Sequence, residues 1–159
     1  MMAQTAVVDR RENAFYVQSW DSSSGNYPIH FQGTWVKRLE GDVPDDIIGH
    51  AVREAMAESR AGISPQAISH DELGRIRRAL FRLAGVRGER RYQTGLTTIS
   101  VDYDPGAPDY EITEYINRNP DENLTASDER HLLPAECSDE ILGRTIRDLL
   151  NSRSHGPTD

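Results

Sequence analysis

Two stretches of the sequence, VPDDIIGHAVRE at residues 43–54 and CSDEILGRTIRD at residues 137–148, carry the same helix-opening pattern. In each copy, acidic residues occupy the first turn, where the helix dipole favours negative charge, and apolar pairs recur at helical spacing. A glycine stands at the same place in both, although glycine costs about 1 kcal/mol relative to alanine in an exposed helix. We therefore expect two amphipathic helices that pack alike, with each glycine allowing a close approach to a sheet.

Other segments predict strands and a further helix. Residues 15–20 and 29–36 are rich in aromatic and β-branched residues and flank the turn-forming run DSSSGN, so they predict a hairpin. Residues 70–84 have apolar positions at helical spacing, and Gly85 is placed to end that helix. The remaining expected elements are strands over 92–103, 110–116 and 131–133, helices over about 44–59 and 138–151, and a loop over 117–127.

These elements predict a single domain of the α/β (α+β) class over residues 13–153, with a mixed sheet of about five strands and three amphipathic helices. Residues 1–12 are expected to be a flexible N-terminus, and residues 154–159 a disordered tail. The apolar positions of the repeated blocks and the helices they open are expected to form the core: Ile47, Ile48, Val52, Ile141, Leu142, Ile146 and Leu149.

The second block carries a resemblance to a known family. PAECSDEILG at residues 134–143, with a helix ending LLNSR at residues 149–153, resembles the C-terminal signature of the immunity proteins of contact-dependent growth inhibition (CDI) systems. DDIIG at residues 45–49 and ESR at residues 58–60 resemble that family's first helix. The resemblance implies a small cytoplasmic protein without catalysis that binds and blocks the cognate C-terminal toxin domain of a large secreted effector.

Charge is segregated along the chain. The net charge is −8, and residues 102–129 hold nine acidic residues and one arginine. Residues 75–91 hold seven arginines and one glutamate. Tyrosines interleave with the acidic residues, so this segment offers both an electrostatic field that steers a basic partner and aromatic side chains that anchor it. Nuclease toxins are commonly basic because they grip a polyanion, and a carboxylate surface would block that grip.

The acidic segment therefore supplies the candidate toxin contacts. They are Asp102, Asp104, Asp109, Glu111, Glu114, Asp121 and Glu122, with Tyr103 and Tyr110 as anchors. A solvated loop that keeps the protein soluble would account for the same carboxylates, and the sequence leaves that alternative open.

Two other classes of function stay open. The arginines between Arg75 and Arg91 are suited to contact phosphates, which would make the protein a nucleic-acid-binding regulator, although the acidic net charge opposes that role. Asp102 and Asp104 would hold a divalent cation in a small metal-dependent enzyme, but the residues after them do not complete a calcium loop.

No motif in the sequence signals an enzyme, a cofactor or a metal centre, and we expect none. The histidines at 30, 50, 70, 131 and 155 are scattered, without the spacing of a helical zinc site. The single cysteine, Cys137, fits a reducing compartment. Since no apolar run approaches the roughly 20 residues of a membrane span, we expect a cytoplasmic protein with no membrane partner. Because the net charge is acidic, we also expect no direct contact with nucleic acid.

Overall fold

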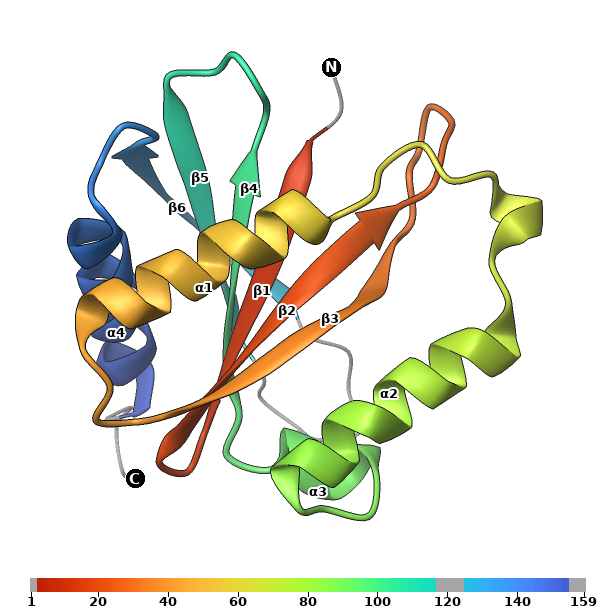
Figure 1. The fold of residues 1–159 in the computed structure, drawn as a ribbon, viewed down its shortest axis with the longest axis horizontal. Helices are drawn as coiled ribbons and strands as arrows, with labels where there is room; N and C mark the ends of the chain where they lie inside the picture. The colour runs from red at the N-terminus through yellow and green to blue at the C-terminus, as the bar shows by residue number, and fades with distance from the viewer. Residues whose placement is uncertain (1–2, 117–124, 155–159) are drawn as a thin grey trace.

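The computed structural model describes residues 3–116 and 125–154 as one sheet with helices on both faces (Figure 1). The strands are β1 Gln4–Arg11, β2 Ala14–Ser22, β3 His30–Glu40, β4 Thr97–Tyr103, β5 Asp109–Ile116 and β6 Thr125–Pro134. The helices are α1 Asp45–Glu58, α2 His70–Ala84, α3 Glu89–Gln93 and α4 Asp139–Ser154, with a 3-10 turn at Pro65–Ala67.

The predicted α+β class is confirmed, but the sheet is antiparallel where a mixed sheet was expected. In the described residues six strands run in the order β3-β2-β1-β4-β5-β6, and every neighbouring pair is antiparallel. The expected number of about five strands is close to the observed six. The sixth, β1, comes from the predicted flexible N-terminus, so the expected boundary at residue 13 is wrong.

Strand β1 lies at the middle of the sheet, between β2 and β4. Ala6 and Val8 are fully buried on one face and Thr5, Val7 and Asp9 are buried on the other. Because β1 has a neighbour on each side, its backbone forms hydrogen bonds with both β2 and β4. This pairing orders the N-terminal part of the chain.

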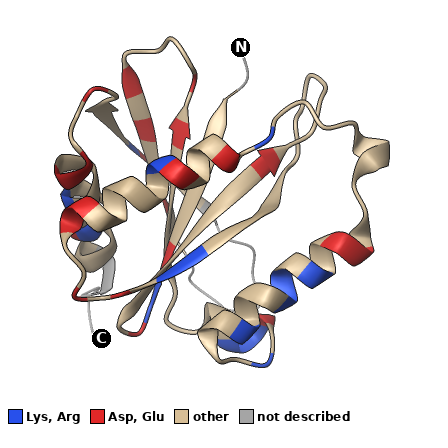
Figure 2. Ribbon diagram, in the orientation of Figure 1, with Lys and Arg blue, Asp and Glu red and all other residues tan. Residues whose placement is uncertain are grey.

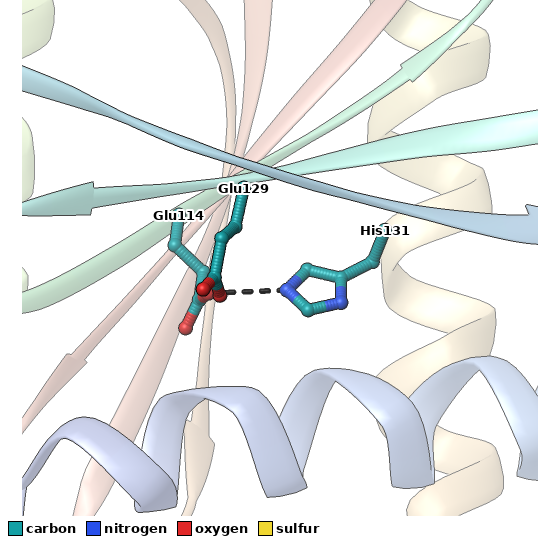
Figure 3. A group of neighbouring side chains, drawn as sticks. All are labelled: Glu114, Glu129 and His131. Atoms are coloured by element: carbon teal, nitrogen blue, oxygen red, sulfur yellow. Dashed lines mark hydrogen bonds and ion pairs between the residues drawn. The ribbon is translucent and has the colours of Figure 1, made fainter.

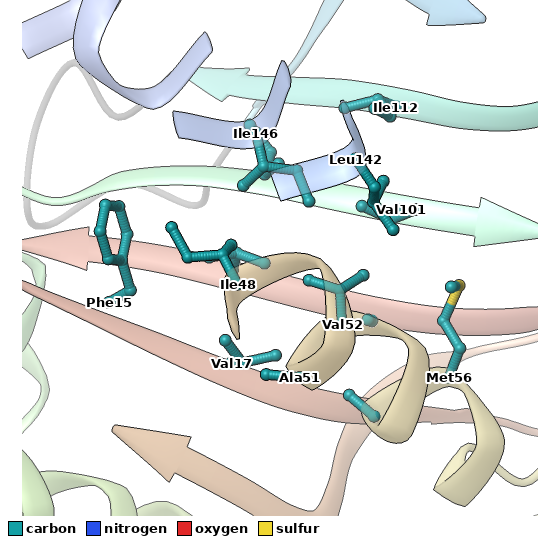
Figure 4. Packing of buried hydrophobic residues seen from close by; sticks show 14 of the residues in the cluster. Phe15, Val17, Ile48, Ala51, Val52, Met56, Val101, Ile112, Leu142 and Ile146 are labelled. Carbon is teal, nitrogen blue, oxygen red and sulfur yellow. The ribbon is translucent and has the colours of Figure 1, made fainter. Parts of the chain in front are cut away.

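One face of the sheet is covered by α1 and α4, and we call it the helix-pair face. Ala6, Phe15, Val17, Val101 and Ile112 project from it into the largest apolar cluster of the described residues (Figure 4). The two helices contribute Ile48, Ala51, Val52, Met56, Leu142, Ile146 and Leu150. Since side chains alternate along a strand, the intervening residues belong to the opposite face.

The opposite face is covered in part by α2 and α3, and we call it the cavity face. A smaller apolar cluster joins Ala14 and Tyr16 of β2 to Leu80 of α2 and Tyr92 of α3. The predicted bounds of α2 are confirmed: the Ser69 side chain caps its start, and Gly85 ends it with a left-handed φ of 71°. The segment expected to begin a strand at residue 92 instead forms α3, and β4 starts at Thr97.

The predicted core is partly confirmed. Ile48, Val52, Leu142 and Ile146 are fully buried and Leu149 packs against the cluster. Ile47 and Ile141 are 40% and 47% exposed, because they stand one residue outside the buried stripe of each helix. The loop expected at 117–127 is a strand from residue 125 onward, and residues 117–124 and 155–159 lie outside the described part of the chain.

The repeated glycines bring two helices together, which corrects the expected approach to a sheet. A Cβ atom added at Gly49 would overlap the carbonyl oxygen of Asp139, and one added at Gly143 would overlap that of Asp45. Each helix therefore crosses the other at its own glycine, with the first turn of one seated on the second turn of the other. Such reciprocal contacts define an approximate two-fold axis between α1 and α4.

The arginines of the two blocks close this crossing. Arg53 donates to the Asp139 carboxylate and the carbonyl of Cys137, and its guanidinium lies over the ring of Tyr110. Arg147 donates to Asp45 and to the carbonyl of Val43 in the same way. The two copies of the repeat therefore form a pseudo-symmetric helix pair, in which equivalent residues make equivalent contacts. No helix among the described residues is long and apolar enough to cross a membrane.

Candidate partner-binding site

A cavity of about 780 Å³ lies between the cavity face and the inner side of α2. Its apolar and aromatic wall includes Trp20, Phe31, Leu73, Leu96 and Tyr115, which come from strands β2, β3 and β5, helix α2 and the segment before β4. Its polar wall includes Asp9, His30, Gln32 and Arg77. Concave, mostly apolar sites with a few converging polar groups are the usual form of binding sites.

Asp9 forms the centre of a buried polar network behind this cavity. Asp9 is 4% exposed, and its carboxylate accepts hydrogen bonds from Gln18 Nε2 and Thr98 Oγ1, both at 2.7 Å, and from the hydroxyl of Tyr92. Burial nevertheless raises the pKa of Asp9 above its ordinary value of 3.8, since desolvation outweighs these donors. Burial, and then the Asp9 carboxylate, raise the pKa of Tyr92.

Arg77 connects this network to the cavity. It pairs with Glu89, with Nε at 2.8 Å from the carboxylate, and its guanidinium lies over the rings of Phe81 and Tyr92 at 5.3 and 5.2 Å. It also donates to Gln32 Oε1 at 3.3 Å. Its charge is therefore held in place beside the cavity wall.

Gln32 has an unused hydrogen-bond donor. The residue is 7% exposed, and its Nε2 atom has no hydrogen-bond partner in the part of the chain that the structure describes. A buried donor without an acceptor costs about 1–3 kcal/mol. An acceptor brought into the cavity by a bound partner would recover that loss.

Replacing Asp9 by asparagine tests the buried carboxylate. Below pH 3.8 the group is protonated in both states; above it, the unfolded chain ionises first, so the free energy of unfolding falls as pH rises through the raised native pKa. The variant has no such fall. We therefore expect its stability, relative to the native chain, to improve from pH 4 to 8 in urea titrations, whereas parallel curves would show that Asp9 ionises normally in the fold.

Some of the sequence-predicted contact residues come together on the cavity face. Asp102 and Glu111 are cross-strand partners, and alternation places both on the same face as Thr98 and Tyr115, which line the cavity. Asp102 accepts from Thr5 Oγ1 at 2.7 Å, and burial raises its pKa. Glu111 pairs with Arg130 at 2.7 Å.

Other predicted contacts point elsewhere. Tyr103 and Tyr110 stack edge to face at 5.1 Å, but Tyr110 is 5% exposed within the apolar cluster and its hydroxyl accepts from Arg53. Glu114 is 4% exposed on the helix-pair face. Asp104 is exposed and Asp109 half-buried at the two ends of the β4–β5 turn. Asp121 and Glu122 lie outside the described residues.

Sequence reasoning missed the cavity residues. Asp9 falls in the segment taken as a flexible end, and its signal was a lone acid in the alternating run TAVVD. Trp20 and Gln32 belong to the predicted hairpin, but a hairpin pattern does not say which face another element leaves open. Arg77 counted as one basic residue among seven.

The structure also locates the residues of the two alternative functions, a metal-dependent enzyme and a nucleic-acid-binding regulator. Asp102 uses its carboxylate oxygens on Thr5 and Ser100, and neither it nor Asp104 belongs to a group of metal-ligating atoms in residues 3–116 and 125–154. Six of the seven arginines from 75 to 91 are exposed on and around α2 and α3 (Figure 2), while Arg77 is turned toward the cavity.

The whole fold is similar to that of two solved bacterial structures. The first is a protein of unknown function from Neisseria meningitidis, with a TM-score of 0.77 and 17% identity over 95% of this chain and 94% of that one. The second is a chain of the CdiA-CT/CdiI toxin and immunity complex from Yersinia pseudotuberculosis, with a TM-score of 0.75 and 13% identity over 96% and 98%. No family model and no curated protein sequence matches the chain. At these identities the likeness is one of fold.

Proposed function

We propose that this protein is an immunity protein that binds and neutralises the C-terminal toxin domain of a CDI effector, without catalysis of its own, in the cytoplasm. The observation that carries the proposal is the likeness of fold over nearly the full length to a chain of a toxin and immunity complex. The resemblance of the two helix-opening blocks supports it separately, since it was found in the sequence.

We further propose that the toxin docks on the cavity face. The cavity combines aromatic walls with the unused donor of Gln32, and a docked segment would satisfy that donor with a carbonyl or carboxylate oxygen. Occupation of the cavity is also consistent with inhibition by occlusion, because a segment held there is withdrawn from the toxin's own substrate surface.

The acids at the β4–β5 end, which are exposed or half-buried, would steer a basic toxin, such as a nuclease, toward this face. We define the β4–β5 acidic group as Asp104, Asp109 and Glu111. Figure 2 shows acidic residues along β4 and β5 and basic residues on α2, so the field of the molecule is uneven. An uneven field accelerates association with an oppositely charged partner.

Co-expression with the toxin domain encoded beside its gene tests the proposed class. We expect the two proteins to co-elute in size-exclusion chromatography and cells to survive toxin expression. Separate elution together with cell death would contradict the proposal.

Reversing the β4–β5 acidic group tests the steering role. We expect lysine at Asp104, Asp109 and Glu111 to slow association with the toxin by about 10-fold or more at low salt, with little effect on dissociation. The matched control reverses the exposed acids Glu12, Asp42 and Asp148, which changes the net charge equally. Equal association rates for the two variants in stopped-flow measurements would remove the acidic group from the interface.

A further inference from the structure

A second cluster of polar side chains lies on the helix-pair face, away from the cavity. Glu114 of β5 and Glu129 and His131 of β6 point toward one another (Figure 3). Each contributes one potential ligand atom, and these atoms all lie within 4.8 Å of one another. His131 Nε2 is 3.1 Å from Glu114 Oε2.

The pairing of β5 with β6 brings the three side chains together. Ile112 pairs with His131 and Thr113 with Arg130, and the register then shifts between Thr113 and Tyr115. The ligand atoms of Glu114 and Glu129 nevertheless lie within 4.8 Å of each other. Two carboxylates at this separation repel each other, and a cation between them would remove that repulsion.

Burial fixes one of the three ligands in place. Glu114 is 4% exposed and its Oε2 atom lies 3.1 Å from His131 Nε2, whereas Glu129 is exposed and His131 is half-buried. A divalent cation that enters from the solvent side would take one carboxylate oxygen from each glutamate and a nitrogen from the imidazole.

We propose that Glu114, Glu129 and His131 bind a divalent first-row transition metal ion, for which Zn²⁺ is the matching probe. One imidazole nitrogen and two carboxylate oxygens belong to the ligand set of zinc, and three protein ligands leave a fourth position for water or another donor. Mg²⁺ and Ca²⁺ prefer all-oxygen sites, so the histidine favours a transition metal.

Isothermal titration of the chelator-treated full chain with Zn²⁺ tests the site, and it requires no toxin. We expect saturable binding of one ion per chain. Glutamine at Glu114, Glu129 or His131 should weaken it by at least ~10-fold, because each substitution removes a ligand. The matched control is His70→Gln, which removes an exposed histidine at the start of α2 and should leave the affinity unchanged.

Two results would overturn the site. One is the lack of saturable Zn²⁺ binding by the native chain; the other is unchanged affinity in His131→Gln. If the buried substitution Glu114→Gln impairs folding, Glu129→Gln decides the question, since Glu129 is exposed and circular dichroism can verify its fold. A chain that binds Zn²⁺ but fails to protect against the toxin would uphold the site and contradict only the proposed function.

Discussion

Alanine at Gly143 is expected to destabilise the protein by about 3 kcal/mol or more, since overpacking at a rigid contact is among the costlier changes to a core. The added methyl group would overlap the carbonyl oxygen of Asp45 in the opposing helix. Backbone atoms cannot rotate away as a side chain can, so α1 and α4 would have to separate. The apolar cluster between them and the sheet would then lose its packing.

The same substitution elsewhere provides the control. Gly74 lies inside α2, where an added Cβ would meet the far end of the flexible Arg78 side chain at 3.1 Å. Because alanine favours a helix by about 1 kcal/mol over glycine, Gly74→Ala should be neutral or stabilising. Urea unfolding of both variants measures the difference, and Gly143→Ala as stable as Gly74→Ala would mean that the helices do not cross at this glycine.

Truncation of Arg147 to alanine is expected to cost about 3 kcal/mol, the usual range when a partly buried ion pair loses one partner. The guanidinium donates to Asp45 at 2.7 Å and to the carbonyl groups of Gly41 and Val43. It also lies over the ring of Phe15 at 5.5 Å. Removing it leaves those acceptors partly buried and unpaired, at the point where the chain passes from β3 into α1.

Arg144, in the same helix, is the matched control. Its side chain is 56% exposed and its ion pairs are with Glu140 and Asp45, so its truncation should cost no more than about 1 kcal/mol. The two alanine variants are compared by thermal and urea unfolding. Similar losses of stability in both would show that Arg147 acts as an ordinary surface charge.

Local patterns in the sequence predicted much of the fold. Helix α2 was bounded correctly because its apolar period and its terminal glycine are local signals that act within a few residues of the chain. The hairpin of β2 and β3 followed from aromatic and β-branched runs around a turn. The repeat itself, with acids at its start, apolar pairs at helical spacing and a glycine at a fixed place, predicted two helices that pack alike.

Tertiary structure decided what those local patterns leave open. Strand β1 is ordered by its pairing with β2, which follows it directly in the chain, and with β4, which comes much later. The residues of β1 alone do not reveal that these two strands flank it. The candidate contacts divided for the same reason: the sequence offered Tyr110 and Glu114 as contacts within an acidic segment, yet they are only 5% and 4% exposed in the fold.

The sequence by itself thus determined the elements, the repeat and the uneven charge, because each arises from interactions between near neighbours in the chain. Which face each side chain occupies, and so the cavity beside Gln32 and the meeting of Glu114 with His131, was decided by strand register and helix packing. Those depend on contacts between residues far apart in the chain, which no single segment encodes.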